Sequence, residues 1–433
     1  ANDTLVNLTN PKLAGGNFTI YRLHTTQSDM ALFTGGKRLS NQQMTLPEDF
    51  NISGTIIGNS GKLNTNLNMV TNEGNVALRG SFSNLTNPNS ITYNATVSAR
   101  SVRLGKILHQ QGQLGDVSAH FAFAGKGATP NTINTKFNGT VDDLTYNNYR
   151  YRIVKLSGFL IRKAFSATMV ANDPNLDLDL TASGNLTDNP SFKINGMIDS
   201  IKTLPLHLTT QNIIFRGQID ATVSNLSADN PDANVLISKM LFVSDGSRLP
   251  LDTLQILSGK NDTANYIVMR SNIANARLTG QYRLADMGSI IQNTLQPYFS
   301  TTTPANVAQV KPYDFSFTLD VVNSPVLKSF MPDLTSMEPI HAEGRFATGQ
   351  GMTAKISSKS IIYGTNEISN LNVTAYTSDS GLHVNGVVAR LKTGSSFDLY
   401  NARVNATANH NLIDFSLGLD DQNSKNKYFL AGS

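Results

Sequence analysis

The chain has 433 residues, of which 15% are charged, and a formal net charge of +4, and its length suits about three domains with sizeable cores. It contains no cysteine, which excludes disulfides and cysteine-ligated metals. Lys and Arg are scattered, tryptophan is absent, and no stretch approaches the roughly 18 apolar residues of a membrane-spanning helix, so we expect no nucleic-acid partner and no membrane span.

Apolar and polar residues alternate through most of the chain. Leu63 to Met69 alternates apolar residues and threonine with asparagines, and Val76 to Phe82 alternates similarly after a turn at Asn72 to Asn75. Further strands are predicted at 93–99, 117–123, 149–153, 165–171, 176–180, 192–198, 213–223, 276–284, 315–321, 352–356, 382–388, 404–408 and 415–419. One apolar and one polar face per strand is typical of antiparallel sheets. The sequence therefore predicts an all-β fold built as an antiparallel meander.

Ten of these segments carry a glycine at the centre of an apolar-x-Gly-x-apolar pentapeptide. The glycines are Gly54, Gly80, Gly139, Gly158, Gly184, Gly196, Gly217, Gly280, Gly344 and Gly386. Because side chains alternate between faces, each glycine lies on the apolar face, where it marks a bulge, a bend or a close approach to the backbone. The pattern predicts a long, strongly curved sheet with gaps in its apolar face. The alternative is that the glycines are bends of an ordinary packed β-sandwich.

Helical periodicity occurs in three places. Ser101 to Gln111 and Ala285 to Phe299 each place apolar residues on one face, and Ser324-Pro325 begins a short helix that reaches Phe330. We expect these helices to cover a sheet edge or mouth. They indicate segments 1–112, 113–299 and 300–433, which could also form one continuous sheet.

No pattern of catalytic or metal-binding residues is present. The seven histidines are isolated in sequence, and no nucleophile elbow or phosphate loop occurs. Asp173, Asp177 and Asp179 have EF-hand-like spacing but lack the central glycine and closing glutamate, so we expect a solvated strand face. The sequence predicts that the protein is not an enzyme and has no metal site and no cofactor.

Residues 137–186 carry a more specific pattern. Tyr146, Tyr149 and Tyr151 precede Leu156-Ser-Gly158, and Asp173-Pro-Asn-Leu176 follows. This passage resembles the TamB branch of the AsmA-like family, in which Tyr-x-x-Tyr-x-Tyr, Leu-x-Gly and Asp-Pro-Asn-Leu recur in the periplasmic β-rich region. Val102 to Leu108 is similar to the short "Leu-Gly-Lys-Leu-Leu" helices of these proteins. The family's N-terminal membrane anchor and C-terminal conserved region have no counterpart here, so their properties are not carried over.

The resemblance implies a U-shaped sheet, folded like a taco around an open apolar groove. It implies a periplasmic location between the inner and outer membranes of a diderm bacterium, within a longer protein anchored in the inner membrane by a segment outside this one. The implied partners are phospholipid acyl chains and, through regions outside this segment, an outer-membrane β-barrel assembly protein of the Omp85 type.

The expected function is therefore that of a bridge segment that carries phospholipid along an apolar groove and supports outer-membrane biogenesis. A continuous apolar groove would remove most of the cost of exposing an acyl chain to water, about 0.8 kcal/mol per methylene. The candidate groove-lining residues are Leu78, Phe82, Leu176, Leu178, Leu180, Ile194, Ile198, Phe215, Ile219 and Leu278. For each of them, ordinary core packing is the alternative role.

Two other functions remain open. A chaperone-like assembly factor would template outer-membrane proteins by strand addition at an exposed sheet edge, a function also attributed to TamB relatives. A secreted carbohydrate-binding or adhesive β-module would need an exposed aromatic platform, which the lack of tryptophan disfavours.

Overall fold

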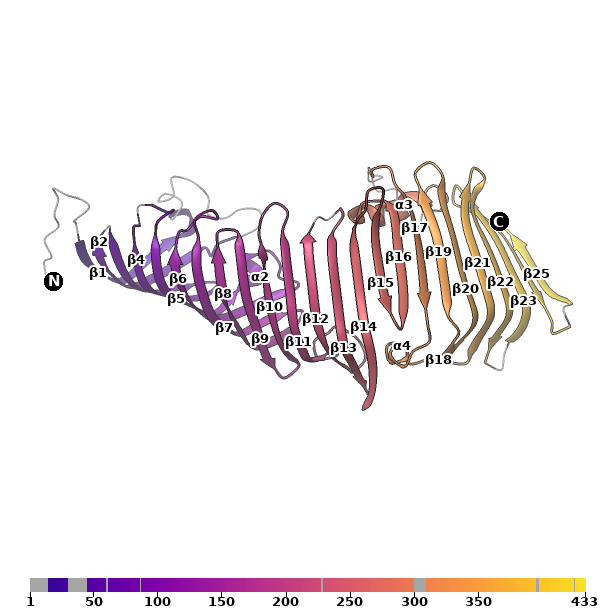
Figure 1. Cartoon of the computed structure of the whole chain (residues 1–433), viewed down its shortest axis with the longest axis horizontal. Helices are drawn as coiled ribbons and strands as arrows, with labels where there is room; N and C mark the ends of the chain where they lie inside the picture. The colour runs from indigo at the N-terminus through magenta and orange to yellow at the C-terminus, as the bar shows by residue number, and fades with distance from the viewer. Residues whose placement is uncertain are drawn as a thin grey trace. The chain divides into compact units, whose positions relative to one another are not determined.

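The computed structural model describes residues 15–29, 45–59, 61–85, 87–226, 229–299, 309–394, 397–423 and 425–433. The fold is all-β, as predicted: 25 described strands form open antiparallel sheet, accompanied by a few short helices (Figure 1). The chain packs as two compact units, residues 1–216 and residues 217–433. We call them unit 1 and unit 2 and treat each by itself. The predicted segment boundaries near 112 and 300 stay predictions.

In unit 1 each strand pairs with the next along the chain. The strands are β1 (Gly15–Thr26), β2 (Asp49–Asn59), β3 (Lys62–Thr71), β4 (Gly74–Ser83), β5 (Thr92–Arg103), β6 (Leu114–Lys126), β7 (Asn134–Tyr146), β8 (Tyr149–Ile161), β9 (Ala164–Asp173), β10 (Leu176–Asn185) and β11 (Ser191–Lys202). The pairing is antiparallel throughout. β12 (Ile213–Asn225) crosses the boundary between the units.

Unit 2 repeats the same meander with one interruption. Its strands are β13 (Asp232–Ser244), β14 (Ser247–Lys260), β15 (Asn265–Ser271), β16 (Ala274–Gln281), β17 (Asp314–Val321), β18 (Leu334–Met337), β19 (Ile340–Ala347), β20 (Gly351–Tyr363), β21 (Asn366–Ser378), β22 (Gly381–Thr393), β23 (Phe397–Asn409), β24 (Leu412–Asp420) and β25 (Asn426–Gly432). β17 pairs with β19, and both β18 and β19 pair with the long strand β20.

The three predicted helices are present in shortened form. α2 (Leu104–Ile107) and α3 (Met287–Leu295) lie within the predicted ranges. α4 (Pro325–Phe330) begins as predicted, because the Ser324 hydroxyl accepts a hydrogen bond from the Val326 N–H at 3.2 Å. The predicted strand 276–284 is wrong at its end, since β16 stops at Gln281 and a short 3-10 turn leads into α3.

The strands of unit 1 are bent by irregularities that follow one another across the sheet. Ser101 in β5 and Ile153 in β8 adopt positive φ angles of 46° and 54°. Asp142 in β7 and Asp199 in β11 interrupt the pairing register at neighbouring positions. Bulges bend a strand and increase its twist. The predicted strong curvature therefore arises at this line of bulges.

Most glycines of the pentapeptides mark a close approach of the neighbouring strand, which is one of the roles predicted for them. A Cβ built on Gly158 would lie 2.1 Å from the Ser166 carbonyl oxygen of the next strand. Equivalent overlaps of 1.9–2.5 Å occur at Gly54, Gly80, Gly139, Gly184, Gly196, Gly280 and Gly344. Adjacent strands approach too closely there for any side chain. The expectation that these glycines leave gaps in the apolar face is therefore wrong: the neighbouring strand already occupies the space.

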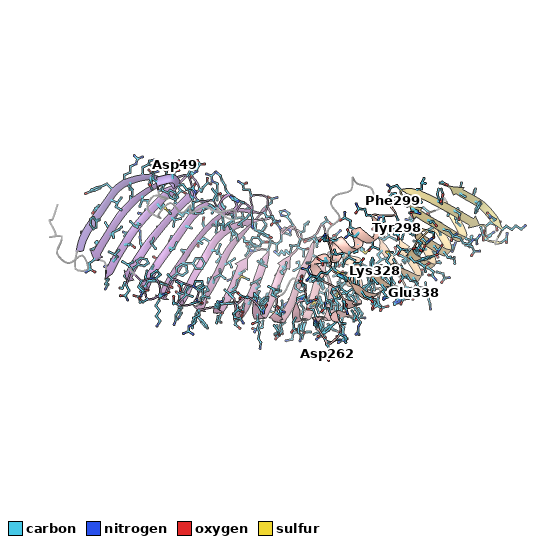
Figure 2. The ribbon with its side chains drawn as sticks, turned by 90° about the horizontal axis from the view of Figure 1, so that it is seen from above. Asp49, Asp262, Tyr298, Phe299, Lys328 and Glu338 are labelled. Atoms are coloured by element: carbon cyan, nitrogen blue, oxygen red, sulfur yellow. The ribbon has the colours of Figure 1, made fainter. Side chains whose placement is uncertain are left out.

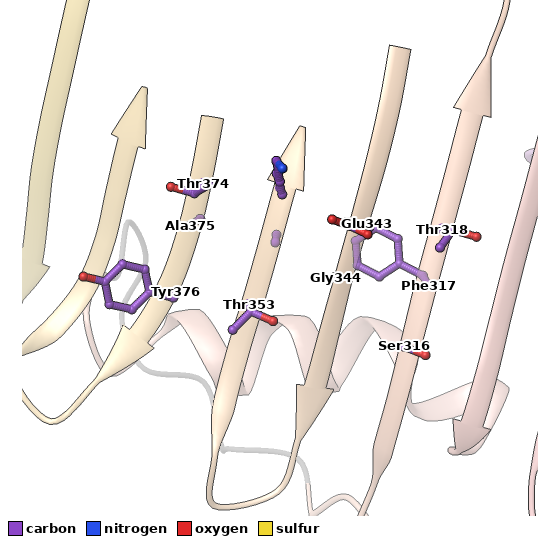
Figure 3. Close-up of a pocket in the computed structure, with 11 residues that line it drawn as sticks. Ser316, Phe317, Thr318, Glu343, Gly344, Thr353, Thr374, Ala375 and Tyr376 are labelled. Carbon is purple, nitrogen blue, oxygen red and sulfur yellow. The ribbon is translucent and has the colours of Figure 1, made fainter. Parts of the chain in front are cut away.

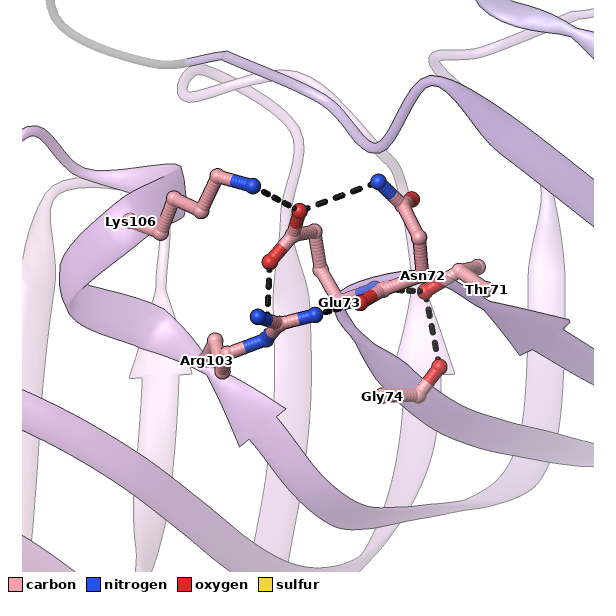
Figure 4. Close-up of polar contacts among 6 residues, drawn as sticks. All are labelled: Thr71, Asn72, Glu73, Gly74, Arg103 and Lys106. Atoms are coloured by element: carbon pink, nitrogen blue, oxygen red, sulfur yellow. Dashed lines mark hydrogen bonds and ion pairs between the residues drawn. The ribbon is translucent and has the colours of Figure 1, made fainter.

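A buried carboxylate ties the turn between β3 and β4 to helix α2 (Figure 4). Glu73 lies 2.6 Å from Lys106 Nζ and 3.0 Å from Arg103 Nε, and its side chain is 5% exposed. Gly105 of α2 is required by packing, because a Cβ there would meet the Leu114 carbonyl oxygen at 1.7 Å. The Leu-Gly-Lys pattern of this helix therefore has a structural explanation.

Candidate functional site

The strand registers of unit 1 align the apolar side chains in rows across the sheet. One row contains Leu67, Leu78, Val97, Phe121, Gly139, Leu156, Met169, Leu180 and Gly196. A parallel row contains Thr65, Gly80, Ala95, Phe123, Phe137, Gly158, Ala167, Ala182 and Ile194. We call the surface made by these rows the apolar face of unit 1.

Most large side chains of the apolar face are only half-buried. Leu78, Phe121, Leu156 and Leu180 all keep part of their surface accessible to solvent. In a packed sandwich a second sheet would bury such residues almost fully. Among the described residues of unit 1 no second sheet lies over them, so the sandwich alternative does not apply to this unit.

The predicted groove-lining residues divide between the units. Leu78, Phe82, Leu176, Leu178, Leu180, Ile194 and Ile198 share the apolar face of unit 1. Leu178 is 7% exposed and the other six are half-buried. Phe215 and Ile219 lie half-buried on β12, and Leu278 lies on β16 of unit 2. Their roles as lipid contacts stay predictions.

Other residues of the apolar face were missed by the sequence analysis. Phe121, Leu156 and Met169 lie in the row of Leu78 and Leu180, and Phe123 and Phe137 lie in the row of Ile194. Their alternation with polar residues was visible in the sequence. Only the register of each strand pair shows that they join the same rows.

In unit 2 helix α3 covers part of the apolar face. Ile290 of α3 is 1% exposed and packs with Phe315 of β17, Phe346 of β19 and Met352 of β20. Phe315 is 2% exposed, and its ring stacks on Phe346 with centroids 5.4 Å apart. Leu278, one of the predicted groove-lining residues, packs against this cluster. For Leu278 the structure therefore supports the alternative role of ordinary core packing.

The residues that follow α3 reach the turn between β23 and β24 of unit 2. The Tyr298 carbonyl accepts a hydrogen bond at 3.0 Å from the Asn411 N–H in the turn between β23 and β24. Figure 2 labels Tyr298 and the exposed Phe299 that follows it. Tyr282 belongs to the same buried cluster, and burial raises its pKa to about 12. Unit 2 therefore has a local dry core where unit 1 has an open surface.

Hollows are found on the polar face of the described sheet in both units. In unit 1 a hollow of about 730 Å³ is lined by polar residues such as His120, Asn138 and Lys155 together with apolar residues such as Ala122 and Val170. In unit 2 a hollow of about 520 Å³ is lined by side chains of β17, β19, β20 and β21 (Figure 3). On the opposite, apolar side of these strands the Phe317 ring lies beside Gly344, 2.6 Å from where a Cβ would stand. An aromatic ring from the adjacent strand thus fills the space that the glycine leaves.

The passage that resembles TamB-like proteins forms a buried polar cluster. Asp173, 5% exposed, accepts hydrogen bonds from the Tyr149 hydroxyl, from the Arg152 N–H at 2.9 Å and from the Asn175 N–H at 2.9 Å. Burial, followed by the hydrogen bond to Asp173, raises the pKa of Tyr149. The cluster holds the bend at Ile153 against the turn between β9 and β10, which is a structural role.

The described residues contain no group of three or more His, Asp or Glu side chains placed to hold a metal ion. No helix in the described part of the chain is long and apolar enough to cross a membrane. In comparisons with protein-family models, curated proteins and solved structures, no match to this chain was found. The TamB resemblance stays a prediction.

Proposed function

We propose that unit 1 binds the acyl chains of phospholipids on its apolar face and lets them move along it. The observation that carries the proposal is the set of half-buried apolar rows that cross nine strands, β3 to β11, with no second layer over them in the described part of unit 1. Contiguous exposed apolar surface of this kind marks an interaction site.

The energetics favour lipid as the occupant. Each methylene removed from water contributes about 0.8 kcal/mol, so a chain of about sixteen carbons gains on the order of 10 kcal/mol on a continuous apolar surface. Hydrophobic and dispersion contacts have no preferred direction. The rows repeat from strand to strand, so a bound chain meets a similar surface at every step and can slide. Such movement requires no catalytic residue.

The setting we propose is the one that the resemblance implies. The segment would form part of a periplasmic bridge between the inner and outer membranes, supporting outer-membrane biogenesis. Its membrane anchor and its contact with an Omp85-type protein would lie outside this chain. In this role the protein is not an enzyme.

Site-specific photo-crosslinking tests the proposal on the full chain. A benzoylphenylalanine replaces Leu78 or Leu180 on the apolar face, and vesicles of phosphatidylethanolamine and phosphatidylglycerol with radiolabelled acyl chains supply the lipid. Arg79 and Asp179 are matched controls, because Arg79 follows Leu78, Asp179 precedes Leu180, and both side chains are exposed on the polar face.

We expect lipid adducts at Leu78 and Leu180 and none at Arg79 and Asp179. Equal labelling at all four positions, or no labelling at any, contradicts lipid binding on the apolar face. If a cell extract instead yields protein adducts at an edge strand, the strand-addition function is supported in its place.

A further inference from the structure

The strands of unit 1 end in turns along two opposite sides of the sheet, and these two sides, here called edges, carry different charge. We call one of them the basic edge: it holds the turns that follow β2, β4, β6, β8 and β10. Among the described residues, Arg162 and Lys163 lie in one of these turns, Lys62 and Lys126 stand at strand ends beside two others, and Lys136 and Lys193 are the third residues of β7 and β11, against the single acid Asp188. The excess of positive charge lies at one end of the strands. Alternation places the side chains of Lys62, Lys126, Lys136 and Lys193 on the polar side of the sheet, and Arg162 and Lys163 lie in the turn between β8 and β9.

The opposite edge is balanced by acids. There Glu73 pairs with Arg103 and Lys106, and Asp143 pairs with Arg150 at 3.1 Å. Asp116 and Asp177 add further negative charge, and Asp199 pairs with Arg216 at 3.2 Å. The six cations of the basic edge are all exposed, and none takes part in an ion pair with a described residue. Their charge is therefore available to a ligand.

The basic edge borders a third row of the apolar face, which contains Leu63, Phe82, Leu160 and Phe165. Leu160 and Phe165 lie opposite each other immediately beside the turn at Arg162 and Lys163. Leu63 and Phe82 pair next to Lys62 in the same way. The surface therefore changes from apolar to cationic within one or two residues, a distance that the long Lys and Arg stems span easily.

We propose that the basic edge binds the phosphate of anionic phospholipid headgroups whose acyl chains lie on the apolar face. This inference rests on the proposed function and adds a headgroup class and a binding side. Charge complementarity carries it: an anionic lipid places one negative group at the end of its apolar tails, as this edge places positive groups at the end of the apolar rows. A zwitterionic headgroup gains less from such an edge.

Lipid binding by charge-matched variants tests the proposal. The full chain is titrated with monomeric phosphatidylglycerol and phosphatidylethanolamine that carry the same fluorescent acyl chain. One variant combines Lys62→Gln, Lys126→Gln, Arg162→Gln and Lys163→Gln. The matched control combines Arg100→Gln, Arg152→Gln, Lys155→Gln and Lys202→Gln, which removes the same charge elsewhere on unit 1.

We expect the basic-edge variant to lose about tenfold in affinity for phosphatidylglycerol and to keep its affinity for phosphatidylethanolamine. The control variant should still bind phosphatidylglycerol more tightly than phosphatidylethanolamine. In the unmodified chain, high salt should reduce this preference for phosphatidylglycerol. A preference that survives in the basic-edge variant, or that falls equally in both variants, overturns the inference while leaving lipid binding intact. Failure of the unmodified chain to bind either lipid contradicts the proposed function as well.

Discussion

Units 1 and 2 use the same antiparallel meander but treat its apolar face differently. In unit 1 the rows through Leu78 and Leu180 stay half-exposed. In unit 2 helix α3 brings Ile290 onto Phe315, Phe346 and Met352 and removes them from solvent. The same alternating sequence pattern therefore produces an interaction surface in one unit and a small core in the other.

The difference shows what stabilises each unit. Unit 2 gains hydrophobic burial where α3 packs. Unit 1 relies more on its strand pairing and on the close approach of strands at glycines. It also relies on two buried carboxylates: Glu73 pairs with Lys106 at a turn, and Asp173 accepts a hydrogen bond from the Arg152 N–H at a bend. Substitutions should therefore affect the two units through different interactions.

The largest expected effect is in the core of unit 2. Phe315→Ala removes a ring that is 2% exposed and should lower the free energy of unfolding of unit 2 by about 3–5 kcal/mol. The matched change in unit 1, Phe121→Ala, removes a half-buried ring and should cost about 1–2 kcal/mol. Hydrogen exchange measured on peptides from each unit separates the two. Equal losses would show that the apolar face of unit 1 is as well covered as that of unit 2.

Close strand approach in unit 1 is tested by adding one methyl group. Gly158→Ala places a Cβ 2.1 Å from the Ser166 carbonyl and should destabilise unit 1 by about 2 kcal/mol. In unit 2 the nearest atom to a Cβ on Gly386 is Val373 Cγ2 at 3.7 Å, so Gly386→Ala should be neutral or slightly stabilising. Urea unfolding of both variants provides the measurement. Tolerance of alanine at position 158 would mean that the strands can separate there.

The buried cluster at Asp173 should matter somewhat less. Asp173→Ala leaves the Arg152 and Asn175 N–H groups without their acceptor and should cost about 1–3 kcal/mol. Asp177→Ala, four residues away on an exposed position, should change stability by less than about 0.5 kcal/mol. Faster exchange of the Arg152 amide in the first variant alone would locate the effect. Unchanged exchange would show that the bend at Ile153 holds without Asp173.

The sequence predicts those features that depend on neighbouring residues. Ser324-Pro325 marks the start of α4 correctly, because a hydroxyl cap and a proline act within one helical turn. Alternation correctly predicts an antiparallel, all-β fold. It misses β13 and β14, where apolar residues such as Leu241, Phe242 and Val243 follow one another without alternation.

Features that depend on distant residues were not predictable in this way. The bends at Ser101 and Ile153 exist because one strand carries an extra or differently oriented residue relative to its partner. The register between two paired strands cannot be predicted from the sequence of either strand alone. The glycines were recognised as special, but only the register shows that the neighbouring strand fills their space. Likewise, Phe315 and Leu180 have similar local patterns, and only the position of α3 distinguishes core from open face.

The smallest expected effect is a pH dependence confined to unit 2. His341 Nδ1 lies 2.7 Å from Asp320 Oδ1, and the hydrogen bond to this carboxylate raises the histidine pKa above 6.5. Because the pKa of His341 is higher in the folded state, the interaction stabilises the fold fully at a pH below the pKa of the unfolded state. This stabilisation is lost as the pH rises through the pKa of the folded state. Because both side chains are largely solvated, the effect on stability should be slight, and an NMR titration of the ring is the appropriate measurement.

Two variants identify the source of that shift. Asp320→Asn should bring the His341 pKa back toward 6.5. Glu343→Gln should lower it less, because the Glu343 carboxylate lies 3.6 Å from Nε2 and contributes after Asp320. An unshifted His341 pKa, or one that responds equally to both variants, would show that the contact between His341 and Asp320 across β17 and β19 is looser in solution than in the structure.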